Sequence, residues 1–571
     1  MSLRRRAESP MPTPSGARTA ADAAPTPTLE LLQALLPEAP RLTSRLQRFW
    51  PTAGTLHDLA HPWIDGRSPR AELVAALRAI GQVILINNPL SGALLLLALV
   101  LQSGWLALFV VLGIAGAHAM AIASGWEAGE RAEGIVGFNG ALVGGIAAGI
   151  AHPGGASLPL WLVAVPLAGA ASAVLLEALR RWWFGRTALP PLSLPACLIG
   201  WLLLEVLRGL GLAAAPISSA LPPDPAGTLT AVLALAEGIV RAFGQVFFCD
   251  RLSSGLLVLA AVALASPVAA LLGVLGAFTT ALSGLLLGLS SRGEVIAGTL
   301  GFNGVLVAIA VGGIFFAPNR CSVTLAVAGA ALTVPIARLL LAPMAALGIP
   351  LFSLPFVLAT WLVLVLARRA LPALLPVAFH AVLTPEEHRR RFRVARRLLL
   401  DFRQRLQRSA SAAPHSASPM VLATAAAPER LARLRHLFGR LDRDASGCLS
   451  LEELRCALGV DDTHPANTAV KALLDRVVQA MDLDGDGRLT EAEFVELALR
   501  LHQLSQGHQR LLTYLLPVDA DADDQLDHLE LARLLHSVGA RPLTADEERT
   551  LFGAERRPLS WADFVDRLLL S

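Results

Sequence analysis

The chain has 571 residues, of which 54% are hydrophobic and 16% are charged, and its formal net charge is +3. Its mean hydropathy of +0.56 is too high for an ordinary soluble protein and indicates a membrane protein. Its basic stretch directly follows an apolar region, which argues against nucleic-acid binding. We find no nucleophile–base set, phosphate loop or zinc pattern, so the sequence suggests no enzyme.

Composition divides the chain into four parts. Residues 1–68 are rich in Pro, Ala, Thr and Arg, and we expect a disordered or soluble leader. Residues 69–372 are almost continuously apolar, residues 373–427 read as a basic amphipathic helix and a linker, and residues 428–571 are charged. Arginines lie near the start and after the last apolar segment. The positive-inside rule therefore places both termini in the cytoplasm of a multi-pass protein.

The apolar region contains three landmarks that occur twice in the same order. They are Gly-Gln-Val at 81–83 and 244–246, Gly-Phe-Asn-Gly at 137–140 and 301–304, and Ser-Leu-Pro at 193–195 and 353–355. Each phenylalanine follows its glutamine by nearly the same distance, 56 residues in the first copy and 57 in the second. This register predicts a duplicated unit with repeats at about 70–213 and 229–371, and a solute pathway between the two halves.

Twelve apolar runs can be traced, six in each repeat. They lie near 72–86, 90–101, 106–123, 135–151, 157–177 and 195–213, and again near 229–248, 252–264, 267–288, 299–316, 322–342 and 354–371. Several are shorter than the roughly 20 residues that a helix needs to cross a bilayer. Broken helices are tolerated at membrane depth only inside protein or beside a wet cavity. We therefore predict full spans mixed with half-helices.

Few charges lie within these runs. Glu205 and Arg208 are three residues apart, and Glu237 and Arg241 are four apart, so each pair is expected to form an ion pair on one helix face. His118 is isolated, as is typical of an interior histidine. No carboxylate cluster resembles a sodium or proton site. The pathway is therefore expected to suit an uncharged solute.

The landmarks together resemble the urea transporter family, in its bacterial type. The motifs are Gly81-Gln82-Val83, Asn87-Asn88-Pro89-Leu90-Ser91-Gly92, the two Gly-Phe-Asn-Gly turns and the two Leu-Pro boxes, and the match covers about residues 70–371. The resemblance implies an all-α polytopic membrane fold, an inverted repeat of about five transmembrane helices plus a pore half-helix each. It also implies a homotrimer in the cell inner membrane, in which each protomer passes urea through its own pore.

The resemblance also implies roles for eight residues. Phe138 and Phe302 would be the aromatic walls of a narrow slot, opposed by Leu85 and Phe248; Gln82 and Gln245 would present oxygens at two constrictions; Ser193 and Ser353 would stand where the family usually has a threonine. Ordinary helix packing and helix–helix hydrogen bonds are the alternatives for these side chains. The chain departs from the family pattern at Gln245, where many members carry glutamate, and at Ala196, which replaces an aromatic residue.

The charged domain contains a strong calcium-binding pattern. The first twelve-residue loop offers Asp442, Asp444, Ser446, Cys448, Ser450 and Glu453, and the second offers Asp482, Asp484, Asp486, Arg488, Thr490 and Glu493. Calcium takes about seven oxygens, and glycine at position 6 of each loop permits the sharp turn. Both loops are therefore predicted EF-hands that bind Ca²⁺.

Two further copies are weaker. The third offers Asp519, Asp521, Asp523, Gln525, Asp527 and Glu530, but has Asp524 in place of the glycine. A fourth copy ends near Asp563 and keeps only the strand-like Leu559-Ser560-Trp561, so we expect it to pair with the third hand without binding metal. The spacing suits two lobes of paired hands.

The leading hypothesis is passive urea transport modulated by calcium on the cytoplasmic side. One alternative is a facilitator for another small neutral solute, such as a short amide, ammonia or water. Another is a calcium sensor whose membrane part is mainly an anchor. The basic segment 387–407 resembles an amphipathic target helix for the hands, or a helix that lies on the anionic surface of the lipid bilayer.

Overall fold

The computed structural model describes residues 53–56, 69–126, 128–150, 158–210, 228–371, 374, 383–411, 428–457, 486–499, 525–553, 556–560 and 564. Helices dominate these residues, as the all-α class predicts. The described residues between 53 and 410 form one compact unit with those between 525 and 564, and those between 411 and 499 form another.

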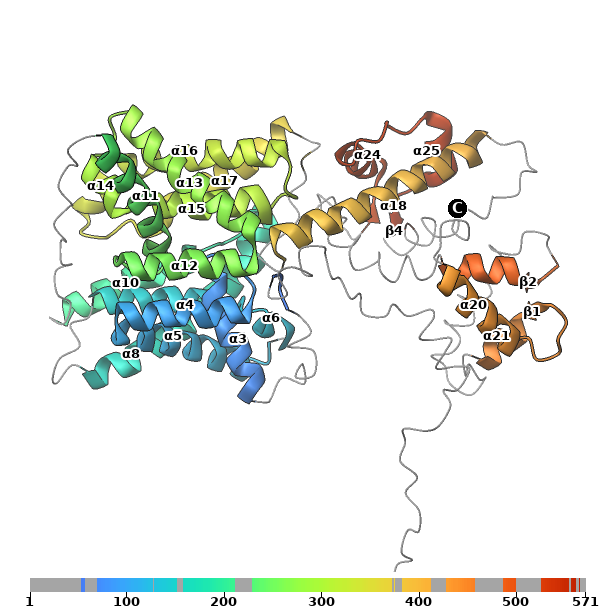
Figure 1. Ribbon diagram of the computed structural model, residues 1–571, viewed down its shortest axis with the longest axis horizontal. Coiled ribbons are helices and arrows are strands. Elements are labelled where there is room, and N and C mark those ends of the chain that lie inside the picture. Colours follow the sequence, from blue (N-terminus) through green and yellow to red (C-terminus); the bar gives the residue numbers. More distant parts are fainter. Residues whose placement is uncertain are drawn as a thin grey trace, which may run out of the picture. The chain divides into compact units, whose positions relative to one another are not determined.

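The apolar region folds as two matching series of helices (Figure 1). The first series is α3 (Pro69–Gln82), α4 (Pro89–Gln102), α5 (Gly104–Ala123), α6 (Ala128–Ala132), α7 (Phe138–Ile150), α8 (Leu158–Leu179) with the π-turn η4 (Arg180–Phe184), α9 (Gly185–Thr187) and α10 (Leu194–Gly209). The second is α11 (Thr228–Gln245), α12 (Leu252–Ala265), α13 (Pro267–Leu286), α14 (Arg292–Ala297), α15 (Gly301–Ile309) with the π-turn η5 (Ala310–Ile314), α16 (Arg320–Ala346) and α17 (Leu354–Ala370).

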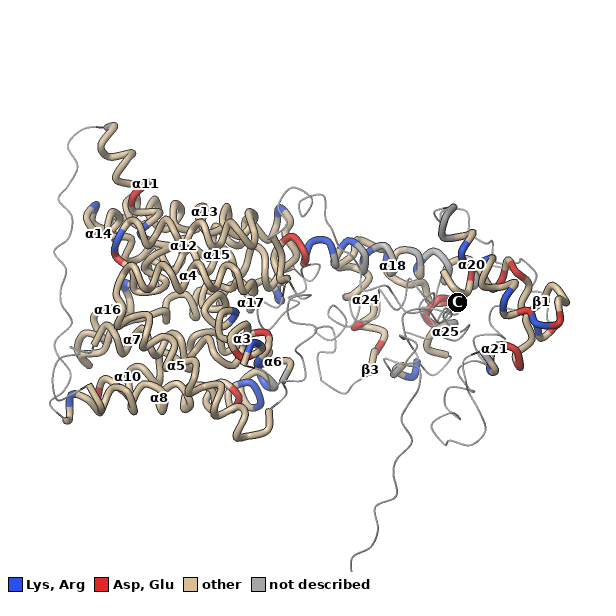
Figure 2. Tube along the Cα trace, turned by 60° about the horizontal axis from the view of Figure 1, so that its bottom comes forward, with Lys and Arg blue, Asp and Glu red and all other residues tan. Residues whose placement is uncertain are grey.

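Helix lengths confirm the predicted mixture of long and short segments. Four helical stretches are long and apolar enough to cross a membrane: Gly104–Ala123, Leu158–Phe184, Pro267–Leu286 and Arg320–Ala346. Four apolar stretches are shorter: Pro89–Gln102, Phe138–Ile150, Leu252–Ala265 and Gly301–Ile314. Charged residues gather near the ends of the helices, and the middle of the bundle is almost free of them (Figure 2). The predicted pairs Glu205–Arg208 and Glu237–Arg241 form, at 2.8 and 2.6 Å.

The last glycine of each Gly-Phe-Asn-Gly motif lets two helices meet backbone to backbone. A Cβ atom on Gly113 of α5 would lie 2.1 Å from the carbonyl oxygen of Gly140 in α7. The second half repeats the contact, where a Cβ on Gly276 of α13 would lie 2.2 Å from the carbonyl oxygen of Gly304 in α15. Side chains are excluded at these crossings, which is the usual basis of close helix packing in membranes.

Helices α3 and α11 end in equivalent strained turns. Leu85 and Phe248 adopt φ of 62° and 59°, the left-handed region that side chains other than glycine rarely occupy. The turns are closed by hydrogen bonds from the amides of Ile86 and Cys249 to the carbonyls of Gly81 and Gly244, at 2.9 and 3.0 Å. The strain costs on the order of 1–3 kcal/mol per residue and is typical of functional sites.

Residues 53–56, which the sequence places in the leader, pack on the membrane domain. Their side chains are mostly buried against the membrane domain. The amide of Gly54 donates to the carbonyl of Ala265 at the end of α12 (2.9 Å), and the Asn88 side chain donates to the carbonyl of Gly54 (2.6 Å). Gly54 lies in a short turn without hydrophobic periodicity, so the sequence could not predict this packing.

The same unit contains a long basic helix and the described parts of the third and fourth predicted hands. Helix α18 spans Pro385–Ser411. The hands contribute β3 (Gln525–Leu526), α24 (His528–Ser537), α25 (Ala545–Phe552) and β4 (Leu559–Ser560). Strands β3 and β4 pair antiparallel, with Leu526 opposite Leu559.

The second unit contains α20 (Pro428–Leu441), β1 (Cys448–Ser450), α21 (Leu451–Ala457) and β2 (Arg488–Thr490). Strands β1 and β2 pair antiparallel, with Leu449 opposite Leu489. Both leucines are fully buried in a core that also holds Phe438 and Phe494. Each strand is the middle of a predicted hand, so the first two hands share one small sheet.

Candidate functional site

A cavity of about 290 Å³ lies between the two halves of the membrane domain. All eight residues predicted for the pore line it: Gln82, Leu85, Phe138, Ser193, Gln245, Phe248, Phe302 and Ser353. Each of these residues from one half lines the same cavity as its counterpart from the other half. None of the described residues that line it carries a charge.

Two serines that line the cavity, one from each half, contact each other. Ser193 precedes α10 and Ser353 precedes α17, and in both helices the following Leu-Pro pair starts the first turn. A serine at such a position usually caps its own helix. Here neither side chain makes a capping bond, and the two hydroxyl oxygens lie 2.7 Å apart. The N-terminal ends of two helix dipoles therefore converge where a polar solute would pass.

The helix starts are capped by two asparagines that our sequence-based prediction did not single out. The side-chain oxygen of Asn139 in α7 accepts from the amide of Ala196, and that of Asn303 in α15 accepts from the amide of Phe356, both at 3.1 Å. Both asparagines are buried. They belong to the repeated Gly-Phe-Asn-Gly motif, so the repetition itself was the signal that could have identified them.

Replacing Asn139 with leucine should therefore displace the start of α10. The change keeps the branched shape of the side chain but leaves the buried amide of Ala196 without its partner, which costs about 1–3 kcal/mol. We expect a lower melting temperature and impaired solute flux, with the same effect for N303L at α17. Stability in detergent and vesicle flux would measure this. The variant S124A, at a side chain that bonds only to a methionine sulfur in the described structure, serves as a control.

The two glutamines lie at equivalent places and make equivalent bonds. Gln82 donates to the carbonyl of Glu133 (2.9 Å), and Gln245 donates to the carbonyl of Ala297 (3.5 Å). Each of these bonds uses the amide nitrogen, and both side chains also line the cavity. The parts of the cavity lined by Gln82 and Gln245, which the sequence predicts to be its two constrictions, are called here the Gln82 mouth and the Gln245 mouth.

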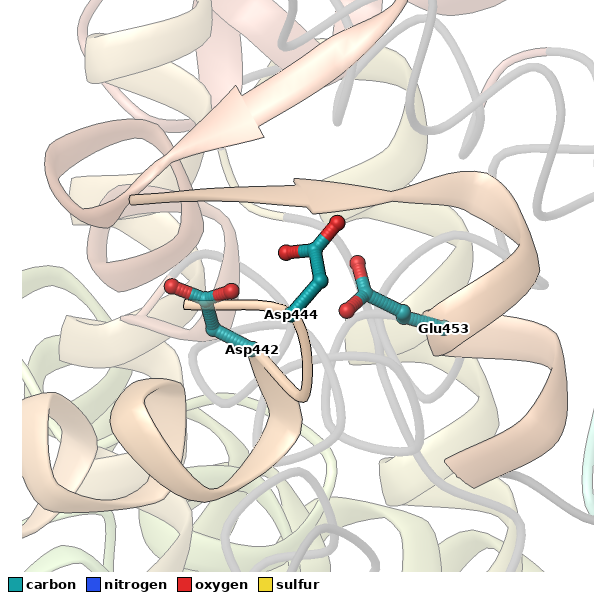
Figure 3. A group of neighbouring side chains, drawn as sticks. All are labelled: Asp442, Asp444 and Glu453. Atoms are coloured by element: carbon teal, nitrogen blue, oxygen red, sulfur yellow. The ribbon is translucent and has the colours of Figure 1, made fainter. Parts of the chain in front are cut away.

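The first calcium-binding loop brings its acidic side chains together. Carboxylate oxygens of Asp442, Asp444 and Glu453 lie within 4.8 Å of one another (Figure 3). The Asp442 and Asp444 carboxylates accept hydrogen bonds from the Ser446 amide, and Glu453 accepts from the Ser450 amide and hydroxyl. The donor set is all oxygen, which fits the preference of Ca²⁺.

These hydrogen bonds also keep the loop ionised. Bonds from Ser446 lower the pKa of Asp444 from its ordinary value of 3.8. Burial raises the pKa of Glu453, but hydrogen bonds from Ser450 and from the Arg443 amide together outweigh burial and hold the pKa below its ordinary value of 4.5. Protons should therefore compete with a bound cation only as the pH falls through this acidic range.

The other two loops are described in part. Thr490 donates to Glu493 through its amide and hydroxyl, both at 2.8 Å, and Asp527 and Glu530 form a capping box. Asp486, Arg488 and Gln525 are described, whereas Asp482, Asp484, Asp519, Asp521, Asp523 and Asp563 lie outside the described residues. In all three loops the final glutamate is thus held at the start of the exiting helix, the position of the bidentate ligand in an EF-hand.

Comparison with known proteins decides the family of the membrane domain. The family model "Urea transporter" matches residues 73–368, more than half of the chain. The chain belongs to the urea transporter family. Urea transporter 1 of Ovis aries is 28% identical over 348 residues, covering 59% of this chain and 87% of the relative. The protein of the same name from Rattus norvegicus is 29% identical over 295 residues, covering 51% and 76%.

This member of the urea transporter family carries a second matching region. The "EF-hand domain pair" model matches residues 431–499, which confirms the prediction of EF-hands there. Calcium-dependent protein kinase 31 of Arabidopsis thaliana is 28% identical over 121 residues, which is 21% of this chain and 24% of the kinase.

Proposed function

We propose that this protein conducts urea passively across the cell inner membrane, through a pore in each protomer of a homotrimer whose termini lie in the cytoplasm. The observation that carries the proposal is the convergence of eight paired residues on one uncharged cavity. Family membership supports urea as the solute.

The chemistry of the cavity suits a flat, neutral, strongly hydrogen-bonding molecule. Urea has amide donors on two edges and one carbonyl acceptor. Phe138, Phe302, Leu85 and Phe248 offer apolar faces, while glutamine oxygens and serine hydroxyls offer successive partners for the edges. Each of these groups replaces a hydrogen bond that urea loses when it leaves water, yet binds urea weakly enough for urea to move on, which conduction requires. To pass between the two serines, urea would break the Ser193–Ser353 hydrogen bond and form hydrogen bonds to the two hydroxyl groups in its place.

Stopped-flow uptake into proteoliposomes tests this function. Urea should equilibrate faster than formamide or acetamide, and without an imposed ion gradient. Faster movement of the short amides would favour a facilitator for another neutral solute. Calcium-dependent partner binding with no solute flux would instead favour a membrane-anchored sensor.

We infer that Ca²⁺ binds the first hand through the side chains of Asp442, Asp444, Ser446, Ser450 and Glu453 and the carbonyl of Cys448. The second hand would use Asp482, Asp484, Asp486, Thr490 and Glu493 with the carbonyl of Arg488, and the third would use Asp519, Asp521, Asp523, Asp527 and Glu530 with the carbonyl of Gln525. Bound calcium would supply charge neutralisation and rigidity to the loops, and so modulate the pore.

The variant E453Q should weaken calcium binding at the first hand at least tenfold, because a neutral amide cannot act as a bidentate anion. Calcium titration by calorimetry at neutral pH measures the effect. E452Q, which alters the neighbouring glutamate outside the predicted ligand set, is the matched control. Equal affinity in E453Q and E452Q would contradict the ligand assignment.

A further inference from the structure

Helix α18 begins with a capping box that docks on the membrane domain. Glu387 accepts from the amide of Thr384 at 3.0 Å, and its own amide contacts the Thr384 hydroxyl. Its neighbour Glu386 accepts from the Ser266 hydroxyl (2.6 Å) and the Val268 amide (2.9 Å) at the start of α13. The first turn of α18 is thus fixed by charge-assisted hydrogen bonds, the stronger class.

From Glu387 a chain of polar contacts leads to the Gln82 mouth. The second carboxylate oxygen of Glu387 accepts from the amide and hydroxyl of Thr55, at 3.1 and 3.2 Å. The guanidinium of Arg78 donates to the carbonyl of Thr55 and to the carboxylate of Glu133, both at 3.1 Å. The carbonyl of Glu133 then accepts from Gln82.

The contacts in this chain are strengthened by the burial of Arg78 and Thr55. Arg78 is 1% exposed and Thr55 is also 1% exposed, so water competes little for either. Arg78 lies one helical turn before Gln82 on α3, and it also donates to the side chain of Asn87 in the turn that carries Leu85. Removing the carboxylate that orders Thr55 would leave buried donors without a partner, which is costly in a low-dielectric interior.

The Gln245 mouth lacks this connection. Arg241 is the counterpart of Arg78, since both precede their glutamine by four residues. Arg241 donates to Glu237 on its own helix and to the carbonyl of Asp250, the counterpart of Asn87. Among the described contacts of Arg241, none leads to α18. The duplicated unit is therefore symmetric at its glutamines and asymmetric in what holds them.

The far part of α18 is held by the third and fourth hands. Phe402 is fully buried and packs edge-on against Phe564, with ring centroids 5.6 Å apart. Arg403 forms a buried ion pair with Glu547 and donates to the carbonyl of Pro542 (3.0 Å). Arg396 donates to the carbonyl of Val538 (2.8 Å). One helix thus contacts both the hands and the pore-mouth network.

We propose that Glu387 is a positioning residue for the Gln82 mouth, and that α18 is the element through which the C-terminal hands act on solute entry. This inference rests on the proposed function, because it names the contacts through which calcium binding at the hands would affect the pore. Movement of α18 would displace Thr55, release Arg78 and Glu133, and loosen the Gln82 constriction while leaving the Gln245 mouth unchanged.

The test compares four variants of the full-length protein in proteoliposomes, with and without calcium on the tail side. E387A removes the carboxylate, whereas E387Q keeps an oxygen acceptor for Thr55. T384A removes the helix cap but leaves the Glu387–Thr55 contact, and E237A removes the ion-pair partner at the other mouth. Urea half-saturation, maximal rate and discrimination against N,N′-dimethylurea are measured, together with hydrogen exchange of residues 78–87.

E387A should change half-saturation or discrimination by about threefold to tenfold, abolish the calcium response and increase exchange at residues 78–87. E387Q should restore all three, and T384A and E237A should keep the calcium response. Equal exchange and selectivity in E387A and T384A would overturn the positioning role. Calcium responses that are the same in wild type and E387A, including no response in either, would overturn the route through α18. Hydrogen exchange can be measured whether or not the protein conducts urea. A failure of the proposed function can therefore be distinguished from a failure of the positioning role.

Discussion

Urea flux should fall at least tenfold when Gly145 is replaced by alanine. Gly145 lies in α7 behind the ring of Phe248, and a Cβ atom built on it would stand 2.6 Å from two ring carbons. Contacts this short do not occur, and the backbone of α7 is packed on both sides, so the aromatic ring must yield. Phe248 lines the cavity, and its displacement would narrow the path of the solute.

The matched control is Gly149→Ala, one turn later on the same helix. Gly149 is exposed, and a Cβ atom there meets nothing within 4 Å. Both changes raise helix propensity equally, so a difference in flux isolates the clash with Phe248. Stopped-flow flux and size-exclusion profiles of both variants check this. Unchanged flux in a properly assembled G145A protein would remove Phe248 from the pore wall.

Replacing Arg403 with methionine should destabilise the C-terminal pair of hands by about 3–5 kcal/mol. The change leaves the Glu547 carboxylate buried without its main cation, which is the expensive way to break an internal ion pair. Arg403 and Glu547 are 6% and 4% exposed, respectively. Hydrogen exchange of residues 525–553 in the full-length protein should rise accordingly. Arg549→Met is the control, because the Arg549–Asp546 pair is exposed and such pairs contribute at most about 1 kcal/mol.

The same ion pair predicts a pH dependence. Burial raises the pKa of Glu547, but bonds from Arg403 and Thr544 outweigh burial and hold it below its ordinary 4.5. A depressed pKa in the folded state stabilises the fold above about pH 4.5, and this stabilisation is lost as the pH falls through the folded value. Wild type should therefore lose protection on acidification. R403M should show little of that acid-induced change, because its carboxylate has lost the main source of the depression.

The features that could be predicted from sequence are those that the duplication repeats. Gln82 and Gln245, or Ser193 and Ser353, stand out because equal spacing recurs in two halves, and a shared cavity follows if the halves meet. The roles of Asn139 and Asn303 were missed because a buried asparagine gives no periodic signal, although it lay inside a repeated motif. The part of the network at Thr55 could not be predicted, since it joins segments more than 300 residues apart.

Contacts between the halves were also beyond sequence reasoning. Gly145 and Phe248 belong to different repeats, and spacing within a repeat says nothing about which face of one half meets the other. The calcium-binding loops could be predicted from sequence, because each loop closes on itself within twelve residues. Local chemistry therefore sufficed to place Asp442, Asp444 and Glu453 around one point.

The hydroxyl pair in the cavity has a consequence for the direction of movement. In the proposed pore, a molecule entering from either side would meet a glutamine, an apolar slot and then the same two serines, in the same order. A passive pore has the same unsaturated permeability in both directions whatever its profile. The nearly symmetric order of groups predicts in addition that urea half-saturation measured from the two sides should be nearly equal, and unequal values would report the unequal supports of the two ends.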